Sequence, residues 1–142
     1  MQLSRFTDYT LRVLFFVAAN NDRLVTLSEI AAFYDISVEH LRKVVHALSK
    51  SGHLATFRGK HGGIRLAIEP SEINIGQVVA QAEGKEPLID CSKQGCRLTG
   101  ACALQSVLDR AQQEFMQVLE EYTLADLTKS PTMRQRLMLK AV

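Results

Sequence analysis

Residues 26–66 read TLSEIAAFYDISVEHLRKVVHALSKSGHLATFRGKHGGIRL. The stretch opens with Thr26 and has Glu29 three residues later, which is the pattern of a capping box at the start of a short helix. A turn at Asp35 follows, and Ser37 is placed to cap a second helix over residues 38–51, which Gly52 ends. Two helices joined by so short a turn predict a helix-turn-helix unit.

The second helix of this unit has an inward and an outward face when it is read at about 100° per residue. The apolar side chains of the inward face are Val38, Leu41, Val44, Val45 and Leu48. The opposite face is basic and rich in hydrogen-bond donors, which suits a helix in the major groove of double-stranded DNA. An ordinary amphipathic surface helix is the alternative. The outward and flanking residues are Glu39, His40, Arg42, Lys43, His46 and Lys50.

A basic hairpin is predicted directly after this helix. Residues 53–57 and 64–68 have the composition of two short strands, and RGKHGG (58–63) joins them through three glycines. Residues 40–68 hold six Lys or Arg, all four His and no acid, which favours a polyanion partner. A hairpin of this kind is typical of the wing of a winged helix, whose cations reach phosphates or the minor groove. We therefore predict DNA contacts from the outward face and from Ser37, Arg58, Lys60, His61 and Arg65.

The remaining elements predict a mainly α fold with a small β wing, a winged helix-turn-helix domain followed by a long dimerisation helix. Ser4 can cap a buried helix over residues 5–20, and Asp8 lies in its first turn, where the helix dipole favours an acid. A short helix is expected over 75–82. A long helix over 101–122 repeats apolar residues four and three apart, as in a heptad seam; a core helix packed on the first helix is the alternative. The seam consists of Leu104, Leu108, Ala111, Phe115, Val118 and Tyr122.

These elements divide the chain into four parts. We expect a DNA-binding domain over 1–84, a cluster-binding loop over 85–102, the dimerisation helix and a following turn over 103–128, and a partly ordered tail over 129–142. The 142 residues contain no apolar run long enough to span a membrane and no signal-peptide pattern. We therefore expect a cytoplasmic protein. We do not expect an enzyme, because the sequence contains no recognisable pairing of a nucleophile with a general base.

All three cysteines of the chain, Cys91, Cys96 and Cys102, lie in one polar loop with Gly95 and Gly100. An odd number of thiols without an export signal argues against a disulfide framework, and their crowding indicates one metal centre. Three unrelated free thiols are the alternative. Structural zinc usually takes four ligands from closely spaced cysteine pairs and histidines. No C-x-x-C pair occurs here and no His follows Cys91, so the spacing favours an iron–sulfur cluster.

The chain resembles the Rrf family of bacterial winged-helix iron–sulfur repressors, most of all its nitric-oxide-sensing members. The resemblance rests on MQLSRFTDY (1–9), RGKHGGIRL (58–66), the three cysteines and YTLADL (122–127). It implies a homodimer that binds promoter DNA, holds a cluster through Cys91, Cys96 and Cys102, and releases DNA when nitric oxide attacks the cluster. It also implies that Asp8, supplied by the other subunit, is the fourth ligand.

Within this resemblance some alternatives stay open. We favour a 4Fe–4S over a 2Fe–2S cluster. Members that use a His three residues after the third cysteine differ from this chain, which has Gln105 there. An iron- or oxygen-responsive regulator of the same family is the second reading, and a cluster-containing redox protein is the alternative from another class.

Overall fold

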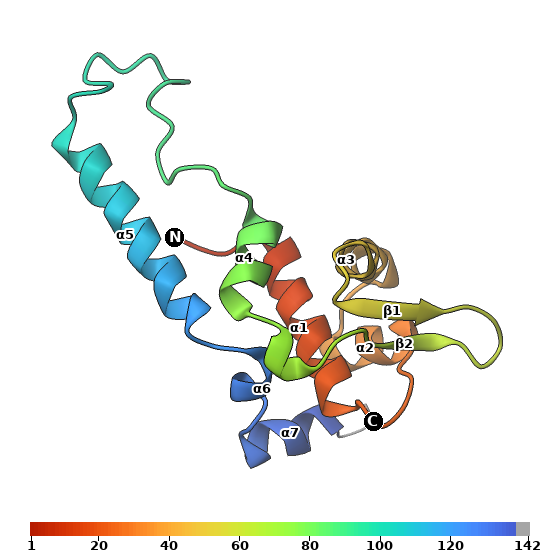
Figure 1. The fold of residues 1–142 in the computed structure, drawn as a ribbon. Helices are drawn as coiled ribbons and strands as arrows, with labels where there is room; N and C mark the ends of the chain where they lie inside the picture. The colour runs from red at the N-terminus through yellow and green to blue at the C-terminus, as the bar shows by residue number, and fades with distance from the viewer. Residues whose placement is uncertain (139–142) are drawn as a thin grey trace.

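The structure is a computed structural model and describes residues 1–138 (Figure 1). Most of it is helical, with one two-stranded antiparallel sheet. In chain order the elements are α1 (Arg5–Ala19), α2 (Leu27–Tyr34), α3 (Val38–Lys50), β1 (Leu54–Phe57), β2 (Gly63–Leu66), a 3₁₀ turn (Pro70–Glu72), α4 (Ile75–Glu83), α5 (Ala103–Glu120), α6 (Leu124–Leu127) and α7 (Pro131–Met138). The predicted fold class is confirmed.

The predicted helix starts are present as hydrogen bonds. The Ser4 hydroxyl accepts from the Thr7 amide at 3.2 Å, and the Ser37 hydroxyl accepts from the His40 amide at 3.2 Å. Thr26 and Glu29 form both halves of the capping box. These bonds satisfy amides that have no partner within their own helix, so residues only three apart decide where α1, α2 and α3 begin.

Helix α1 is the centre of the core. It packs against α3 on one side and α4 on another, and it also contacts β2, α6 and α7. Val13, Leu14 and Val17 are fully buried in it. The inward face of α3 is buried through Leu41, Val44, Val45 and Leu48, while Val38 is only partly buried at the first turn.

The wing is a hairpin in which Leu54 pairs with Leu66 and Phe57 pairs with Gly63. Its strands are shorter than the predicted 53–57 and 64–68. His53 instead lies in the turn between α3 and β1: its amide donates to the Leu48 carbonyl at 2.9 Å, and its own carbonyl accepts from the Ala67 amide at 2.9 Å. On its other edge β2 bridges to Val25 through two backbone hydrogen bonds of 2.9 and 2.7 Å with Ile64. The hairpin therefore projects from an anchored base, on the opposite side of the molecule from α5 (Figure 1).

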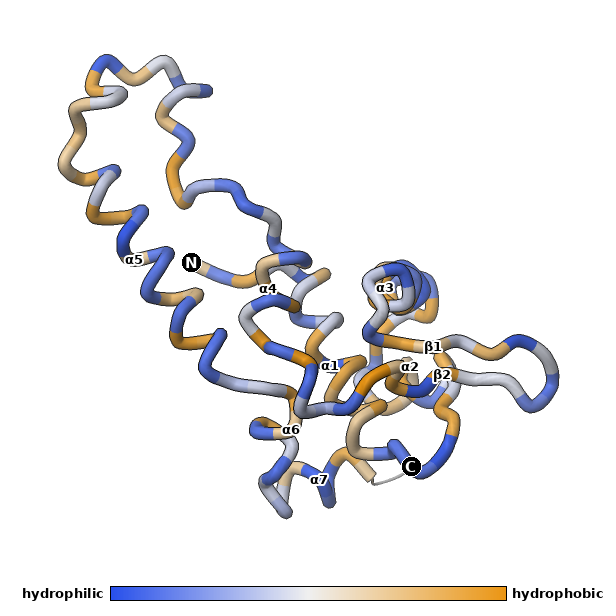
Figure 2. The backbone as a smooth tube through the Cα atoms, viewed as in Figure 1, coloured by the Kyte–Doolittle hydropathy of each residue, from blue (hydrophilic) through white to orange (hydrophobic). Residues whose placement is uncertain are grey.

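Helix α5 contains no buried residue. Met116 and Leu119 pack toward the core on α4, whereas the predicted seam faces away, with Leu104 58% and Val118 54% exposed. Apolar and polar residues alternate along its length in Figure 2. Because so much apolar surface is open to water within one chain, the alternative of a core helix packed on α1 receives no support.

The C-terminal part is more regular than the sequence predicted. Where a partly ordered tail over 129–142 was expected, residues 131–138 form α7, which packs on α1. Leu137 is buried, and the Asn20 side-chain amide donates to the Leu137 carbonyl at 3.3 Å. Residues 139–142 of that tail lie outside the described residues. None of the helices in the described part is long and apolar enough to cross a bilayer.

Candidate metal centre and nucleic-acid interface

The cysteine loop is the connection between α4 and α5, and it lies at the far end of α5 from α6 and α7 (Figure 1). Backbone hydrogen bonds fold it locally. The Cys96 amide donates to the Cys91 carbonyl at 3.2 Å, and the Thr99 hydroxyl donates to the Cys96 carbonyl at 2.7 Å. Gly95 and Gly100 have φ values of 64° and 84°, which side chains other than glycine rarely adopt. The two glycines therefore permit the reversals between successive cysteines.

The three thiols are free and partly or fully exposed. The pKa of the Cys91 thiol is raised, first by partial desolvation and then by the neighbouring Cys96 and Cys102 thiolates and Asp90. The Cys91 sulfur therefore lies within electrostatic range of the other two thiols. Within residues 1–138, however, no three His, Cys, Asp or Glu side chains are arranged to hold a single metal ion. The donor set is three soft thiolates, the ligand type that iron–sulfur clusters use, so its chemistry fits a cluster.

Asp8 lies on the first turn of α1 and is engaged within its own chain. Its Oδ1 accepts from Arg12 Nε at 2.9 Å, with the two side chains 44% and 41% exposed. The Arg12 guanidinium carbon lies 5.5 Å from the centre of the Tyr34 ring. Burial raises the pKa of Tyr34 to about 12, with Arg12 opposing and Asp8 adding to the shift. Tyr34 therefore remains protonated and donates to the Arg12 carbonyl at 3.0 Å.

Glu83 connects the end of α4 with the start of α1, a contact that the sequence reasoning missed. Its carboxylate accepts from the Ser4 amide. Burial acts to raise the pKa of Glu83, but hydrogen bonds from Thr7 and Ser4 outweigh it, so the pKa is lowered. A carboxylate is favoured at the N-terminus of a helix and disfavoured at a C-terminus. Glu83 closes α4 but is stabilised by α1, and no local pattern could reveal this, because 79 residues separate the partners.

The structure places all eleven residues predicted to contact DNA on the exposed surface: Ser37, Glu39, His40, Arg42, Lys43, His46, Lys50, Arg58, Lys60, His61 and Arg65. They come from α3 and the wing, which lie on the same side of the molecule, with hydrophilic residues at the wing tip (Figures 1 and 2). Arg42 pairs with Glu39 at 3.4 Å. Among the described residues the other five cations of this set form no ion pair, which leaves them available to phosphates.

An aromatic pair adds to the packing of α1 on α3. The rings of Tyr9 and His40 lie 6.1 Å apart at an angle of 33°. Tyr9 follows Asp8 directly, and His40 lies in the first turn of α3. The neighbour of the predicted fourth ligand therefore contacts a residue of the predicted DNA-binding face.

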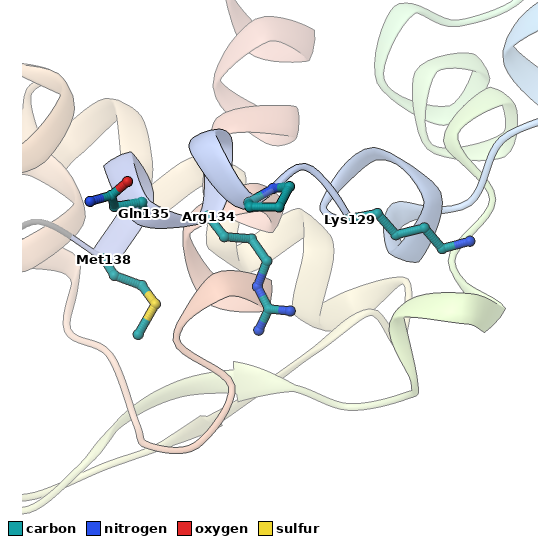
Figure 3. Close-up of a pocket in the computed structure, with 5 residues that line it drawn as sticks. Lys129, Arg134, Gln135 and Met138 are labelled. Carbon is teal, nitrogen blue, oxygen red and sulfur yellow. The ribbon is translucent and has the colours of Figure 1, made fainter.

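A surface hollow of 580 Å³ lies along α7, lined by Lys129, Pro131, Arg134, Gln135 and Met138 (Figure 3). It offers two cations and an amide but no thiol, imidazole or carboxylate. A metal ion prefers the latter donors, so we do not assign the metal centre to this hollow.

The comparisons with known proteins agree with these observations. The Rrf2 family, described as an iron-dependent transcriptional regulator, matches residues 3–130. The chain is similar to the HTH-type transcriptional regulator NsrR of Oceanobacillus iheyensis, with 47% identity over 92% of this chain and 91% of the relative. It is also similar to the solved structure of T. potens IscR, with a TM-score of 0.71 and 27% identity over 91% of this chain and 87% of that one. The fold is shared with Staphylococcus aureus CymR in its oxidised form, at a TM-score of 0.76 and 23% identity over 92% of this chain and 98% of that one. A basic winged helix, a three-cysteine loop and these matches together show that the chain belongs to the Rrf2 family of transcriptional regulators.

Proposed function

We propose that this protein is a nitric-oxide-sensitive iron–sulfur repressor that binds a pseudo-palindromic promoter site as a homodimer in the cytoplasm. The observation that carries the proposal is the placement of a three-thiol loop and a basic winged helix on one compact chain. Helix α1 lies between them and contacts the structures that lead to each. Such a chain can convert a change at the loop into a change at the DNA-binding face.

The residues proposed to hold the cluster are Cys91, Cys96 and Cys102 of one subunit and Asp8 of the other, with a 4Fe–4S cluster favoured over 2Fe–2S. A bound cluster would supply iron that reacts with nitric oxide. Asp8 would exchange Arg12 for iron. The ion pair is well exposed, and such pairs stabilise by about 0.5 kcal/mol, so the exchange has a small cost.

The coupling to DNA would run along α1. Ser4 and Thr7 hold the start of this helix against Glu83 at the entrance of the cysteine loop, and Tyr9 contacts His40 on α3. When Asp8 is released, we expect α1 and the partner subunit to shift relative to one another, which would spoil the spacing of the two recognition helices. Two such helices related by a dyad should read half-sites about 34–36 Å apart.

The decisive experiment uses protein purified anaerobically with its iron and sulfide. We expect it to retard a duplex selected from a random pool by the protein itself, and we expect nitric oxide to abolish the retardation while the cluster absorbance changes. Variants Cys91→Ser, Cys96→Ser and Cys102→Ser should contain less iron and lose the response, with Ser92→Ala as the control. Retardation that persists after complete reaction with nitric oxide would refute the proposed signal.

A second candidate, an iron- or oxygen-responsive regulator, is favoured by the description of the family as iron-dependent. The same retardation assay separates the two. The second function would be favoured if an iron chelator or air released the DNA while nitric oxide, added to the same cluster-loaded protein, did not.

A further inference from the structure

Phe57, at the end of β1, has the most exposed ring of the chain's nine Phe and Tyr residues, with 49% of its surface open to water. The other exposed Phe and Tyr rings are those of Phe6 on α1, and of Phe115 and Tyr122 along or just beyond α5, the helix that lies on the other side of the molecule from the wing (Figure 1). Exposing an apolar ring is unfavourable. A single exposed ring is common on protein surfaces. Phe57 differs because basic residues surround it, and these residues attract a polyanion to the surface that carries the ring.

The strand register places this ring on the same face of the hairpin as a cation. Ala55 pairs with Arg65 and Phe57 pairs with Gly63, so Phe57 and Arg65 lie on the same face of the hairpin, on diagonal positions. Such neighbours are about 7–8 Å apart, within reach of aromatic and long side chains. The opposite face carries the buried Leu54, Ile64 and Leu66, so the Phe57 face is the outer one.

No side chain stands across the ladder from the ring, and the reason is steric. A Cβ at Gly63 would lie 2.8 Å from the Val25 carbonyl oxygen, and a Cβ at Gly62 would lie 2.1 Å from the Phe57 carbonyl oxygen. Both positions are therefore restricted to glycine by the backbone packing. Across the ladder from the ring lies a glycine, and behind it the Leu24 side chain, whose Cβ would be 3.0 Å from a Gly63 Cβ. The exposed Arg58 and Lys60 of the tip follow the ring in the chain.

We propose that Phe57 is a further DNA-binding residue that packs into the minor groove of double-stranded DNA while the wing cations contact the flanking phosphates. This inference rests on the proposed function and extends it. Charge complementarity selects the occupant, because residues 40–68 contain no acid. Proteins that bind the minor groove often combine Arg or Lys contacts with an apolar wedge, such as Phe or Leu, that inserts between base steps. A narrow hairpin with an apolar side chain between cations has the same combination. The 2-amino group of guanine projects into that groove, so Phe57 would favour A·T pairs at its site.

The test measures the dissociation constant of the cluster-loaded protein for a duplex that the wild-type protein has selected from a random pool. We expect Phe57→Ala to raise the constant about tenfold by removing an apolar contact. Its slope of log K against log salt should be unchanged, because no phosphate contact is lost. Phe57→Leu should recover most of the affinity. Ile68→Ala, which trims another partly exposed apolar residue just beyond β2, should change the constant less than twofold, and matching thermal melts would establish that the variants are folded.

A modified duplex gives a second, independent readout. Replacing adenines at the wing position with 2,6-diaminopurine adds an amino group in the minor groove and leaves the major groove unchanged. We expect this change to weaken DNA binding by the wild-type protein and to have little further effect on DNA binding by Phe57→Ala. If Phe57→Ala bound both duplexes as the wild type does, the inference would be overturned while the proposed function stood. If the wild-type protein selected no duplex at all, the proposed function would fall first.

Discussion

At the scale of single residues, Asp8 has two possible partners. In the single chain its carboxylate pairs with Arg12 at 2.9 Å, and both side chains are well exposed. In the proposed dimer the same carboxylate ligates the cluster of the other subunit. A carboxylate is a harder ligand than a thiolate and binds the iron of an iron–sulfur cluster less strongly. Asp8 is therefore the ligand we expect to yield first.

Replacing Asp8 tests this assignment. We expect Asp8→Ala to keep most of the iron but to change the absorbance spectrum, because three thiolates remain. We expect Asp8→Cys to hold the cluster more firmly and to react with nitric oxide more slowly. Stopped-flow absorbance measures both, and Asp22→Ala, at another exposed acid, is the control. An Asp8→Ala protein that matched the wild type in spectrum, rate and DNA affinity would leave Asp8 as only an acid at a helix start.

At the scale of elements, the wing and α3 should contribute differently to DNA binding. The wing carries Arg58 and Lys60 at an exposed tip and Arg65 on a strand. Such cations bind phosphates and carry no sequence information directly. Lys43 and His46 lie on the exposed face of α3, where side chains can reach base edges.

Substitution of Lys60 should therefore weaken binding to all duplexes alike. We expect Lys60→Ala to reduce the slope of log K against log salt by about 0.9, the effect of one lost phosphate contact. Lys43→Ala should instead change which duplexes are selected. Arg134→Ala removes an exposed cation on α7, outside α3 and the wing, and is the control. An unchanged affinity and slope in Lys60→Ala would show that the tip does not touch DNA.

The packing of α4 on α5 depends on Gly76. A Cβ at this position would lie 2.8 Å from the Glu120 amide nitrogen and 2.9 Å from its Cα. Alanine is favoured over glycine inside a helix by about 1 kcal/mol, but a clash with backbone cannot be relieved by a rotamer change. We expect Gly76→Ala to lower the free energy of unfolding by about 1–3 kcal/mol. Chemical denaturation measures this, with Gln77→Ala on the exposed side of α4 as the control; a stabilised Gly76→Ala would contradict the close approach.

At the scale of the whole molecule, the chain leaves one long helix incompletely covered. The seam from Leu104 to Tyr122 faces away from the core, while Met116 and Leu119 on the other side of α5 pack toward it. A second copy of α5 is the occupant that a heptad repeat is suited to bind. The proposed dimer would bury this stripe and place two winged domains side by side.

A charge on the seam should separate the subunits. We expect Val118→Glu to convert the dimer to a monomer, because an unpaired carboxylate would be buried at the interface. Analytical ultracentrifugation measures the mass, and the monomer should bind palindromic duplexes far more weakly. Gln113→Glu introduces the same charge on the opposite side of α5 and should leave the dimer intact. A wild-type protein that sediments as a monomer would refute the proposal that the seam of α5 is a dimer interface.

The accuracy of the sequence-based predictions differs between elements. The starts of α1, α2 and α3 match the prediction, because each depends on a side chain that bonds an amide three residues away. Both strands of the wing are present but end one or two residues away from the predicted positions, and α7 is ordered where a partly ordered tail was predicted. β1 begins only after His53, whose amide bonds the Leu48 carbonyl at the end of α3, and α7 is ordered because Leu137 reaches the end of α1 across the fold.

For the candidate sites, the residue types were apparent in the sequence but their surroundings were not. The three cysteines, the basic face of α3 and the glycine-rich wing are local patterns, and each indicates its chemistry without a fold. Asp8 and Arg12 are one helical turn apart, so the sequence allows them to form an ion pair. Nothing in the sequence, however, shows whether Asp8 forms this ion pair or ligates the cluster.

The sequence by itself determined the winged helix-turn-helix class, the three-thiol loop and the seam of α5, because periodicity, caps and ligand types act over a few residues. Only the tertiary structure decided that Glu83 holds the start of α1, that Tyr9 meets His40, and that Phe57 stands exposed on the face of the wing that also carries Arg65. These contacts join residues that are distant in the chain or in different strands. Their energy depends on how the elements pack, and no local pattern encodes that geometry.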